Sequence, residues 1–146
     1  MKRYELIQYI IDKYNYNRYL EVGISRGECY QNIKCNEKYG VDAARYNEQL
    51  TNIKYCFTNE FIRDNSLIYD VCFIDAGHSF IDSLNDTLGC LRFLAPNGTI
   101  IIHDCNPLSK HATGNDYNGE VWKTIHYFRT FGHDLFTIDT DEGCGI

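Results

Sequence analysis

Two apolar runs, each ending in an aspartate with a histidine close by, constrain the fold of this chain most. The stretch "YDVCFIDAGH" covers residues 69–78, and "TIIIHD" covers residues 99–104. Nearly continuous apolar runs of this length are typical of strands that are buried on both faces, as in a parallel sheet. Ligands of such sheets bind outside the carboxyl ends of the strands. The pattern therefore predicts an α/β fold with its functional residues at the strand ends.

Strands and helices alternate along the remainder of the chain. Apolar residues at helical spacing predict a helix over 3–14, and Ser25 is a candidate cap for a second helix. Further helices are expected over 59–65, from Ser79 to the "APNG" turn at 95–98, and within 118–132, where Gly132 ends the helix. Strands are expected over 18–23, 39–42, 53–57, 69–75, 99–103 and 134–139. This order predicts one domain over residues 1–146, with a mostly parallel sheet and helices on both faces.

The composition limits the binding partners and the cellular compartment that we expect for this chain. The chain of 146 residues carries a net charge of −6, which argues against nucleic acid or an anionic membrane as the main partner. No apolar stretch approaches the roughly 20 residues that cross a bilayer. The seven cysteines include no C-x-x-C pair, so we expect reduced thiols and a cytoplasmic protein.

The first strand is followed by the turn "GISRG", which lacks the glycine spacing of a dinucleotide-binding loop. A nucleoside without phosphates suits this turn better than a pyrophosphate. Asp42 follows the next strand, where an acid can accept hydrogen bonds from both ribose hydroxyls. Taken alone, each of these acids has an ordinary alternative as a turn residue or helix cap.

Five segments, in this order, resemble the class I S-adenosylmethionine-dependent methyltransferases. They are "YLEVGISRG", "YGVDA", "YDVCFIDAGHSF", "APNGTIIIHDCNP" and "NGEVWKTI". Within that class, the chain is most similar to the small macrocin-type O-methyltransferases that act on sugars and natural products. The resemblance covers roughly residues 18–139 and implies a three-layer Rossmann-like methyltransferase fold.

The resemblance also implies roles for individual residues. Glu21 and Gly23 match the motif at the methionine end of the cofactor, and Asp42 matches the acid that binds the ribose. The implied cofactor-binding residues are Glu21, Gly23, Ser25, Asp42, Asn59 and Asp75. In metal-dependent relatives, acids at the positions of Asp75 and Asp104 hold a divalent cation, usually Mg²⁺.

Methyl transfer from a sulfonium to a hydroxyl needs alignment of the two reactants and removal of a proton. We hypothesise that His78 or His103 is the base, and that Asp75 and Asp104 bind a metal or orient the acceptor. The expected catalytic residues are thus His78, His103 and Asp104. The expected acceptor is a hydroxyl of a small molecule or a glycan.

Two alternatives of other classes remain at this point. One is a binding module that keeps the fold and the cofactor without turnover. The other is a metal-dependent hydrolase or hydroxylase that uses the histidines and aspartates at the strand ends. The chain also departs from the family pattern, because its last strand is expected to be very short or missing and little sequence precedes the first strand to form a lid. An acceptor pocket would then be closed by a second subunit, as in a homo-oligomer, or by a larger protein.

Overall fold

The computed structural model describes residues 1–47, 49–114 and 116–146. In chain order, its elements are α1 (Arg3–Tyr14), β1 (Arg18–Val22), α2 (Glu28–Asn32), β2 (Glu37–Asp42), β3 (Ile53–Tyr55), α3 (Thr58–Asp64), β4 (Tyr69–Ile74), α4 (Phe80–Leu91), β5 (Leu94–Ile102), α5 (Trp122–Thr130), β6 (Thr137–Ile138) and β7 (Cys144–Gly145). No helix among these is long and apolar enough to cross a membrane.

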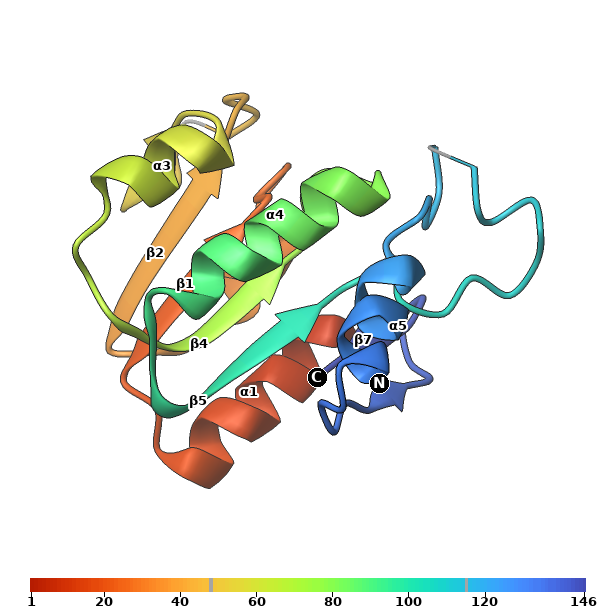
Figure 1. Ribbon diagram of the computed structural model, residues 1–146. Helices are drawn as coiled ribbons and strands as arrows, with labels where there is room; N and C mark the ends of the chain where they lie inside the picture. The colour runs from red at the N-terminus through yellow and green to blue at the C-terminus, as the bar shows by residue number, and fades with distance from the viewer. Residues whose placement is uncertain (48, 115) are drawn as a thin grey trace.

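The strands form one sheet in the order β3-β2-β1-β4-β5-β7-β6, which Figure 1 shows from one face. The pairs among β1 to β5 are parallel, whereas β7 runs antiparallel to both β5 and β6. The predicted alternation of strands and helices, and the mostly parallel sheet, are therefore confirmed. Because β1 lies between β2 and β4, the chain reverses its direction of winding there, which is where open α/β sheets bind ligands.

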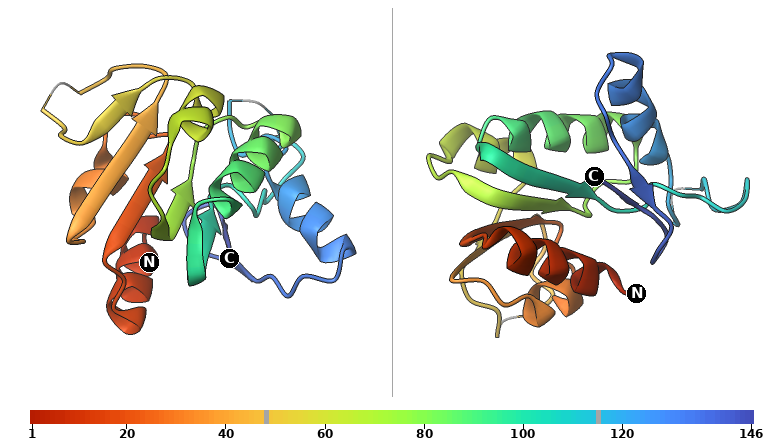
Figure 2. Two further views of the ribbon diagram at one scale, coloured as in Figure 1. Left: turned by 60° about the vertical axis from the view of Figure 1, so that its left-hand side comes forward. Right: turned by 90° about the horizontal axis from the view of Figure 1, so that it is seen from below.

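Helices cover both faces of the sheet and make a three-layer molecule. The right-hand view of Figure 2 shows α1 and α2 below the sheet and α4 and α5 above it. One buried cluster lies toward α1 and includes Leu6, Ile7 and Phe73, and the other lies on the opposite face and includes Leu20, Cys72 and Ile125. The residues of β4 alternate between these two clusters, since Val71 and Phe73 point to the first and Cys72 and Ile74 to the second. This explains the continuous apolar run, because both faces of the central strand are covered.

Most element boundaries match the sequence predictions to within a few residues, and α1 spans the predicted 3–14. Ser79 caps α4, because its hydroxyl accepts a hydrogen bond from the backbone N–H of Asp82. Two predictions of local structure were wrong. Ser25 caps no helix, since α2 begins after Gly27. The segment "APNG" does not separate α4 from a strand but bulges within β5, where the register jumps from Tyr69–Leu94 to Val71–Thr99.

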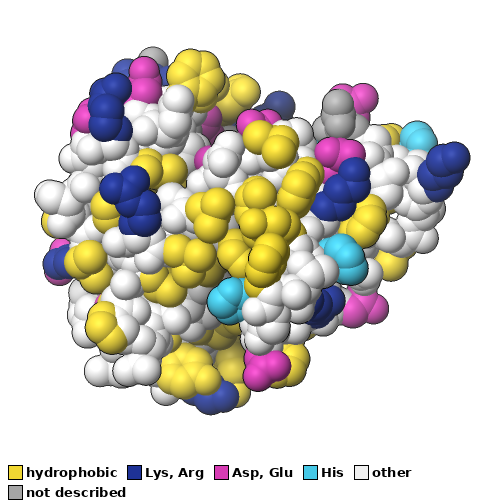
Figure 3. Space-filling model, in the orientation of Figure 1, with side chains coloured by type: hydrophobic (Ala, Val, Ile, Leu, Met, Phe, Trp, Pro, Cys, Tyr) yellow, Lys and Arg dark blue, Asp and Glu magenta, His cyan; other side chains and the backbone are white. Residues whose placement is uncertain are grey.

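The last two strands are very short, as the sequence predicts for this end of the sheet. Both β6 and β7 have two residues, and β7 pairs with β5 only through Gly145 and Ile102. On the neighbouring face, α4 leaves three aliphatic side chains exposed, Ile81, Leu88 and Leu91. Figure 3 shows apolar side chains gathered on this face, at the centre of the view where α4 lies in Figure 1. The covered, regular part of the sheet is therefore β1 to β5, and the site described next lies at its carboxyl edge.

Candidate active site

A cavity of about 820 Å³ opens at the carboxyl ends of β1, β2 and β4. Its volume is within the range of about 300–1,000 Å³ that is usual for small-molecule sites. Of the predicted site residues, six line it: Gly23, Ser25, Asp42, Asn59, Asp75 and His78. The topology thus brings together strand ends that lie far apart in the sequence.

The turn after β1 is shaped by Gly23 and Asp42. Gly23 has a φ of 87°, and a Cβ atom there would collide with the backbone carbonyl of Asp75. Asp42 Oδ2 accepts hydrogen bonds from the backbone N–H groups of Ile24 and Ser25 at 2.8 and 2.7 Å, and Oδ1 accepts one from Ala44 at 2.8 Å. A carboxylate offers about four acceptor sites, so these contacts leave about one for a ligand. The predicted role of Asp42 in binding the ribose hydroxyls stays a prediction.

Glu21 does not line the cavity. Its side chain is buried with Tyr19, whose hydroxyl donates a hydrogen bond to Glu21 Oε2. Burial, together with the charge of Asp75, raises the pKa of Glu21 to about 8, although the bond from Tyr19 opposes this. Glu21 therefore supports the strand end from beneath, and the prediction that it contacts the cofactor has no support from its position.

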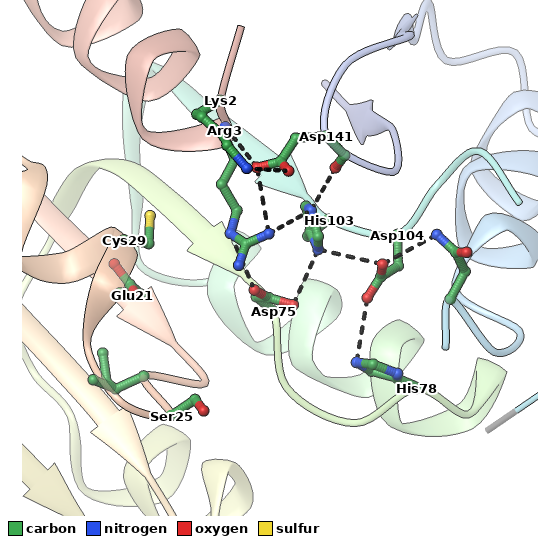
Figure 4. A network of polar contacts seen from close by, with 12 residues as sticks. Lys2, Arg3, Glu21, Ser25, Cys29, Asp75, His78, His103, Asp104 and Asp141 are labelled. Atoms are coloured by element: carbon green, nitrogen blue, oxygen red, sulfur yellow. Dashed lines mark hydrogen bonds and ion pairs between the residues drawn. The ribbon is translucent and has the colours of Figure 1, made fainter. Parts of the chain in front are cut away.

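His103 lies inside the protein between two carboxylates (Figure 4). Its Nδ1 is 3.2 Å from Asp75 Oδ1 and 3.3 Å from Asp104 Oδ1. Its Nε2 is 2.6 Å from the backbone carbonyl of Asp141 and 3.1 Å from Arg3 Nη1. Neither carboxylate oxygen lies in line with an N–H bond at Nδ1, so these two contacts are ion pairs rather than aligned hydrogen bonds. Burial lowers the pKa of His103, but the two aspartates outweigh it and raise this pKa to about 10.

A second histidine meets the same aspartate from the cavity side. His78 Nε2 is 3.2 Å from Asp104 Oδ2, and about a third of the His78 side chain is exposed, against 6% for Asp104. Asn118 Nδ2 donates to Asp104 Oδ1 at 3.1 Å. Asp104 also has a φ of 60°, a backbone conformation that costs about 1 kcal/mol or more in a residue other than glycine. Several contacts therefore hold one carboxylate against His78.

Comparison with known proteins finds one matching family model. Residues 36–105 match the family model of a methyltransferase domain. The matched segment runs from the residue that precedes β2 to the residue that follows Asp104. Comparison with curated protein sequences finds no match.

Solved structures extend the likeness to nearly the whole chain. A protein of Staphylococcus aureus, provisionally named a caffeoyl-CoA O-methyltransferase, is 16% identical with a TM-score of 0.76, and the match covers 97% of this chain and 80% of that one. The O-methyltransferase TomG of Streptomyces achromogenes, in complex with SAM, is 12% identical with a TM-score of 0.71, covering 98% and 77%. An O-methyltransferase of Bacillus cereus in complex with SAH is 12% identical with a TM-score of 0.66, also covering 98% and 77%. At these identities the likeness establishes the fold alone, a Rossmann-like α/β fold.

Three side chains that the sequence did not predict as site residues also line the cavity. Arg3 reaches it from the first turn of α1, and Tyr46 and Phe57 stand at the end formed by β2 and β3. Tyr46 and Phe57 are exposed, at 64% and 68%. No local motif marks these residues, because each is brought to the cavity only by the packing of its element against the sheet.

The residues predicted to hold a metal have suitable atoms but an unsuitable charge. Asp75 and Asp104, the two predicted ligands, present oxygen atoms within 4.8 Å of each other, and His78 adds a third ligand atom within the same distance. However, Arg3 Nε lies 3.7 Å from Asp75 Oδ2. Burial raises the pKa of Asp75, but His103 and Arg3 outweigh it and keep this pKa below its ordinary value. Since resident cations already compensate these carboxylates, a divalent ion does not fit the arrangement.

Proposed function

We propose that this protein transfers the methyl group of S-adenosylmethionine to a hydroxyl of a small molecule or a glycan. The observation that carries this proposal is the cavity at the ends of β1, β2 and β4, in a chain that matches the family model of a methyltransferase domain. The similarity to O-methyltransferases with bound SAM or SAH supports the choice of cofactor and of an oxygen acceptor.

The lining of the cavity suggests how the cofactor lies. Val41, Tyr46 and Phe57 give one end an apolar, partly aromatic surface, which suits the flat purine ring. Asp42 stands between the two ends, within reach of a ribose. The opposite end is formed by Gly23 and Asp75 beside His78, so the sulfonium would be nearest His78.

His78 is the better candidate for the base. Its Nε2 faces Asp104, and a carboxylate at that nitrogen keeps a proton there, which leaves Nδ1 as the basic atom. His103 is buried and its pKa lies near 10, so at neutral pH it carries a proton and cannot take up another. We assign His103 to positioning, because it ties the carboxylates of Asp75 and Asp104 together.

The reaction then follows from alignment and one proton transfer. The acceptor oxygen attacks the methyl carbon in line with the breaking carbon–sulfur bond. Its proton passes to His78 Nδ1, and the products are the methyl ether and neutral S-adenosylhomocysteine. Holding the reactants in line contributes much of the rate, and general base catalysis contributes about 100- to 10,000-fold. We derive no step through a metal, because Arg3 and His103 already lie against Asp75.

Two finer proposals complete this function. All seven cysteines are free, which supports a reducing, cytoplasmic location. The cavity is open to solvent near His78, and we propose that a second copy of the chain or another protein covers the bound acceptor.

Calorimetry with S-adenosylhomocysteine, followed by assays of its release with a panel of hydroxyl acceptors, tests the proposal. Binding with turnover of one acceptor is the expected result. Binding without turnover of any acceptor would favour a non-catalytic module. No binding at millimolar ligand would refute the proposed function.

A further inference from the structure

The segment Asn118–Glu120 lies against the proposed base, although it does not line the cavity. It begins the motif "NGEVWKTI" and precedes α5. Asn118 is buried, with 4% of its surface exposed. A buried amide in a connecting loop needs partners for its polar atoms. The partners of this segment include the carboxylate of Asp104 and the backbone of His78.

The amide nitrogen of Asn118 uses both of its hydrogen atoms. It donates one hydrogen bond to Asp104 Oδ1 and one to the backbone carbonyl of Glu142, each at 3.1 Å. Oδ1 of Asp104 therefore faces Asn118 and the His103 ring. Oδ2 is left to His78 Nε2, which lies 3.2 Å from it (Figure 4). The amide fixes this orientation of the carboxylate without placing a charge beside it.

Gly119 and Glu120 hold the backbone of His78. The N–H group of Glu120 donates to the carbonyl of His78 at 2.8 Å. Gly119 has a φ of 58°, and a Cβ atom there would lie 2.2 Å from the same carbonyl oxygen, so the close approach requires glycine. Glu120 Oε2 also accepts a hydrogen bond from the backbone N–H of Phe80 at 3.4 Å. The segment thus contacts the loop that carries His78 as well as the carboxylate that faces it.

We propose that the segment Asn118–Glu120 positions His78 and Asp104 for proton transfer, with Asn118 as the principal positioning residue. Asn118 acts through Asp104, because it keeps Oδ2 directed at His78 Nε2 and so leaves Nδ1 for the acceptor. The inference rests on the proposed function, since it assumes that His78 takes the acceptor proton. It goes beyond that function by giving a role to residues outside the cavity.

A double-mutant cycle on turnover tests whether Asn118 acts through His78. Asn118→Ala should lower turnover by about 10- to 100-fold, as is typical when the support of a functional group is removed. Calorimetry should find the affinity for S-adenosylhomocysteine within about twofold of wild type. In a His78→Ala background the base is absent, so the same replacement should lower the remaining turnover by less than about twofold. A residue that only stabilises the fold would act equally in both backgrounds.

Asn106→Ala is the matched control. Asn106 lies in the same loop between β5 and α5, and its Nδ2 donates to Asp139 Oδ1 at 2.9 Å. Its replacement therefore also breaks a hydrogen bond between an amide and a carboxylate, but at a place that does not line the cavity. Turnover and S-adenosylhomocysteine affinity should both stay within about twofold of wild type.

A crystal structure of Asn118→Ala gives a readout that does not depend on turnover. The 3.2 Å contact between Asp104 Oδ2 and His78 Nε2 should be lost in that structure, because the carboxylate is free to turn. Retention of the contact would overturn the positioning role, and this result decides the matter where the turnover of His78→Ala is too low to measure.

The outcomes separate this inference from the proposed function. If wild-type protein turns over no hydroxyl acceptor, the proposed function fails and the inference falls with it. If wild type is active, a loss confined to the background that contains His78 supports the positioning role. Turnover of Asn118→Ala within about twofold of wild type, or the same loss in both backgrounds, overturns it. If Asn118→Ala does not fold, Asn118→Ser, which keeps an O–H donor, takes its place under the same criteria.

Discussion

The two ends of the cavity are built in different ways. At the β4–β5 end, Asp75 and Asp104 are fixed by His103, which is itself buried. At the β2–β3 end, Tyr46 and Phe57 are more than half exposed. The first end is held by contacts within the protein, whereas the second is open to water. Groups that act on reacting atoms need fixed positions, while a surface that gains affinity by losing contact with water does not.

Replacement of His78 should have the largest effect, because it removes a group proposed to take part in the chemistry itself. We expect His78→Ala to lower turnover by about 100- to 10,000-fold, while S-adenosylhomocysteine affinity stays within about twofold. Steady-state assays with an identified acceptor and calorimetry measure the two quantities. Full turnover by the variant would remove His78 from the mechanism.

Replacement of His103 tests whether the β4–β5 end depends on a buried charge. The pKa of His103 is raised from 6.5 to about 10, so its contribution to stability is complete below pH 6.5 and is lost as the pH rises toward 10. Between pH 7 and pH 9.5, the free energy of unfolding of wild-type protein should fall by about 3 kcal/mol more than that of His103→Gln.

Urea denaturation at the two pH values measures this difference. All seven cysteines are present in both proteins, so their own ionisation cancels in the comparison. If the free energy of unfolding falls by the same amount in wild type and variant between the two pH values, a protonated His103 is contradicted.

The sequence predicted the fixed end of the cavity better than the open end. Asp75, His78 and Asp104 each follow an apolar run, and the rule that parallel strands end at one edge was enough to bring them together. The aromatic residues Tyr46 and Phe57 lie in a loop and at a short-helix boundary, where no periodicity marks a binding surface. The sequence could not predict which histidine is the base and which positions the aspartates. His78 and His103 differ only in burial and in the partners that the fold supplies.

Arg3 shows a further reason why the sequence does not predict every residue of the site. Its helix was predicted with the observed bounds, but the position of that helix over the end of β4 is a tertiary fact. A basic residue in the first turn of an amphipathic helix is most often solvated. Arg3 instead forms ion pairs with Asp75 and Asp141, which lie far away in the sequence.

Phe57→Ala should have a smaller effect, at the open end. Removal of the ring should weaken binding of S-adenosylhomocysteine and of methylthioadenosine by the same factor of about five, since about 1 kcal/mol is typical of one aromatic contact. Calorimetry with both ligands checks this. A loss confined to S-adenosylhomocysteine would mean that the purine does not lie at this end. Phe136→Ala is a suitable control, because Phe136 is equally exposed, at 70%, and does not line the cavity.

Removal of divalent cations should have the smallest effect. Arg3 and His103 lie against Asp75, and His103 and His78 lie against Asp104, so the carboxylates are compensated without a metal. Dialysis against EDTA should change neither S-adenosylhomocysteine affinity nor turnover beyond about twofold, and the spectrum of added Mn²⁺ should stay that of the free ion. Turnover that disappears with EDTA and returns with Mg²⁺ would show that a cation displaces these contacts. In that case the resemblance to metal-dependent relatives would predict metal binding by Asp75 and Asp104 better than the charges around these two residues do.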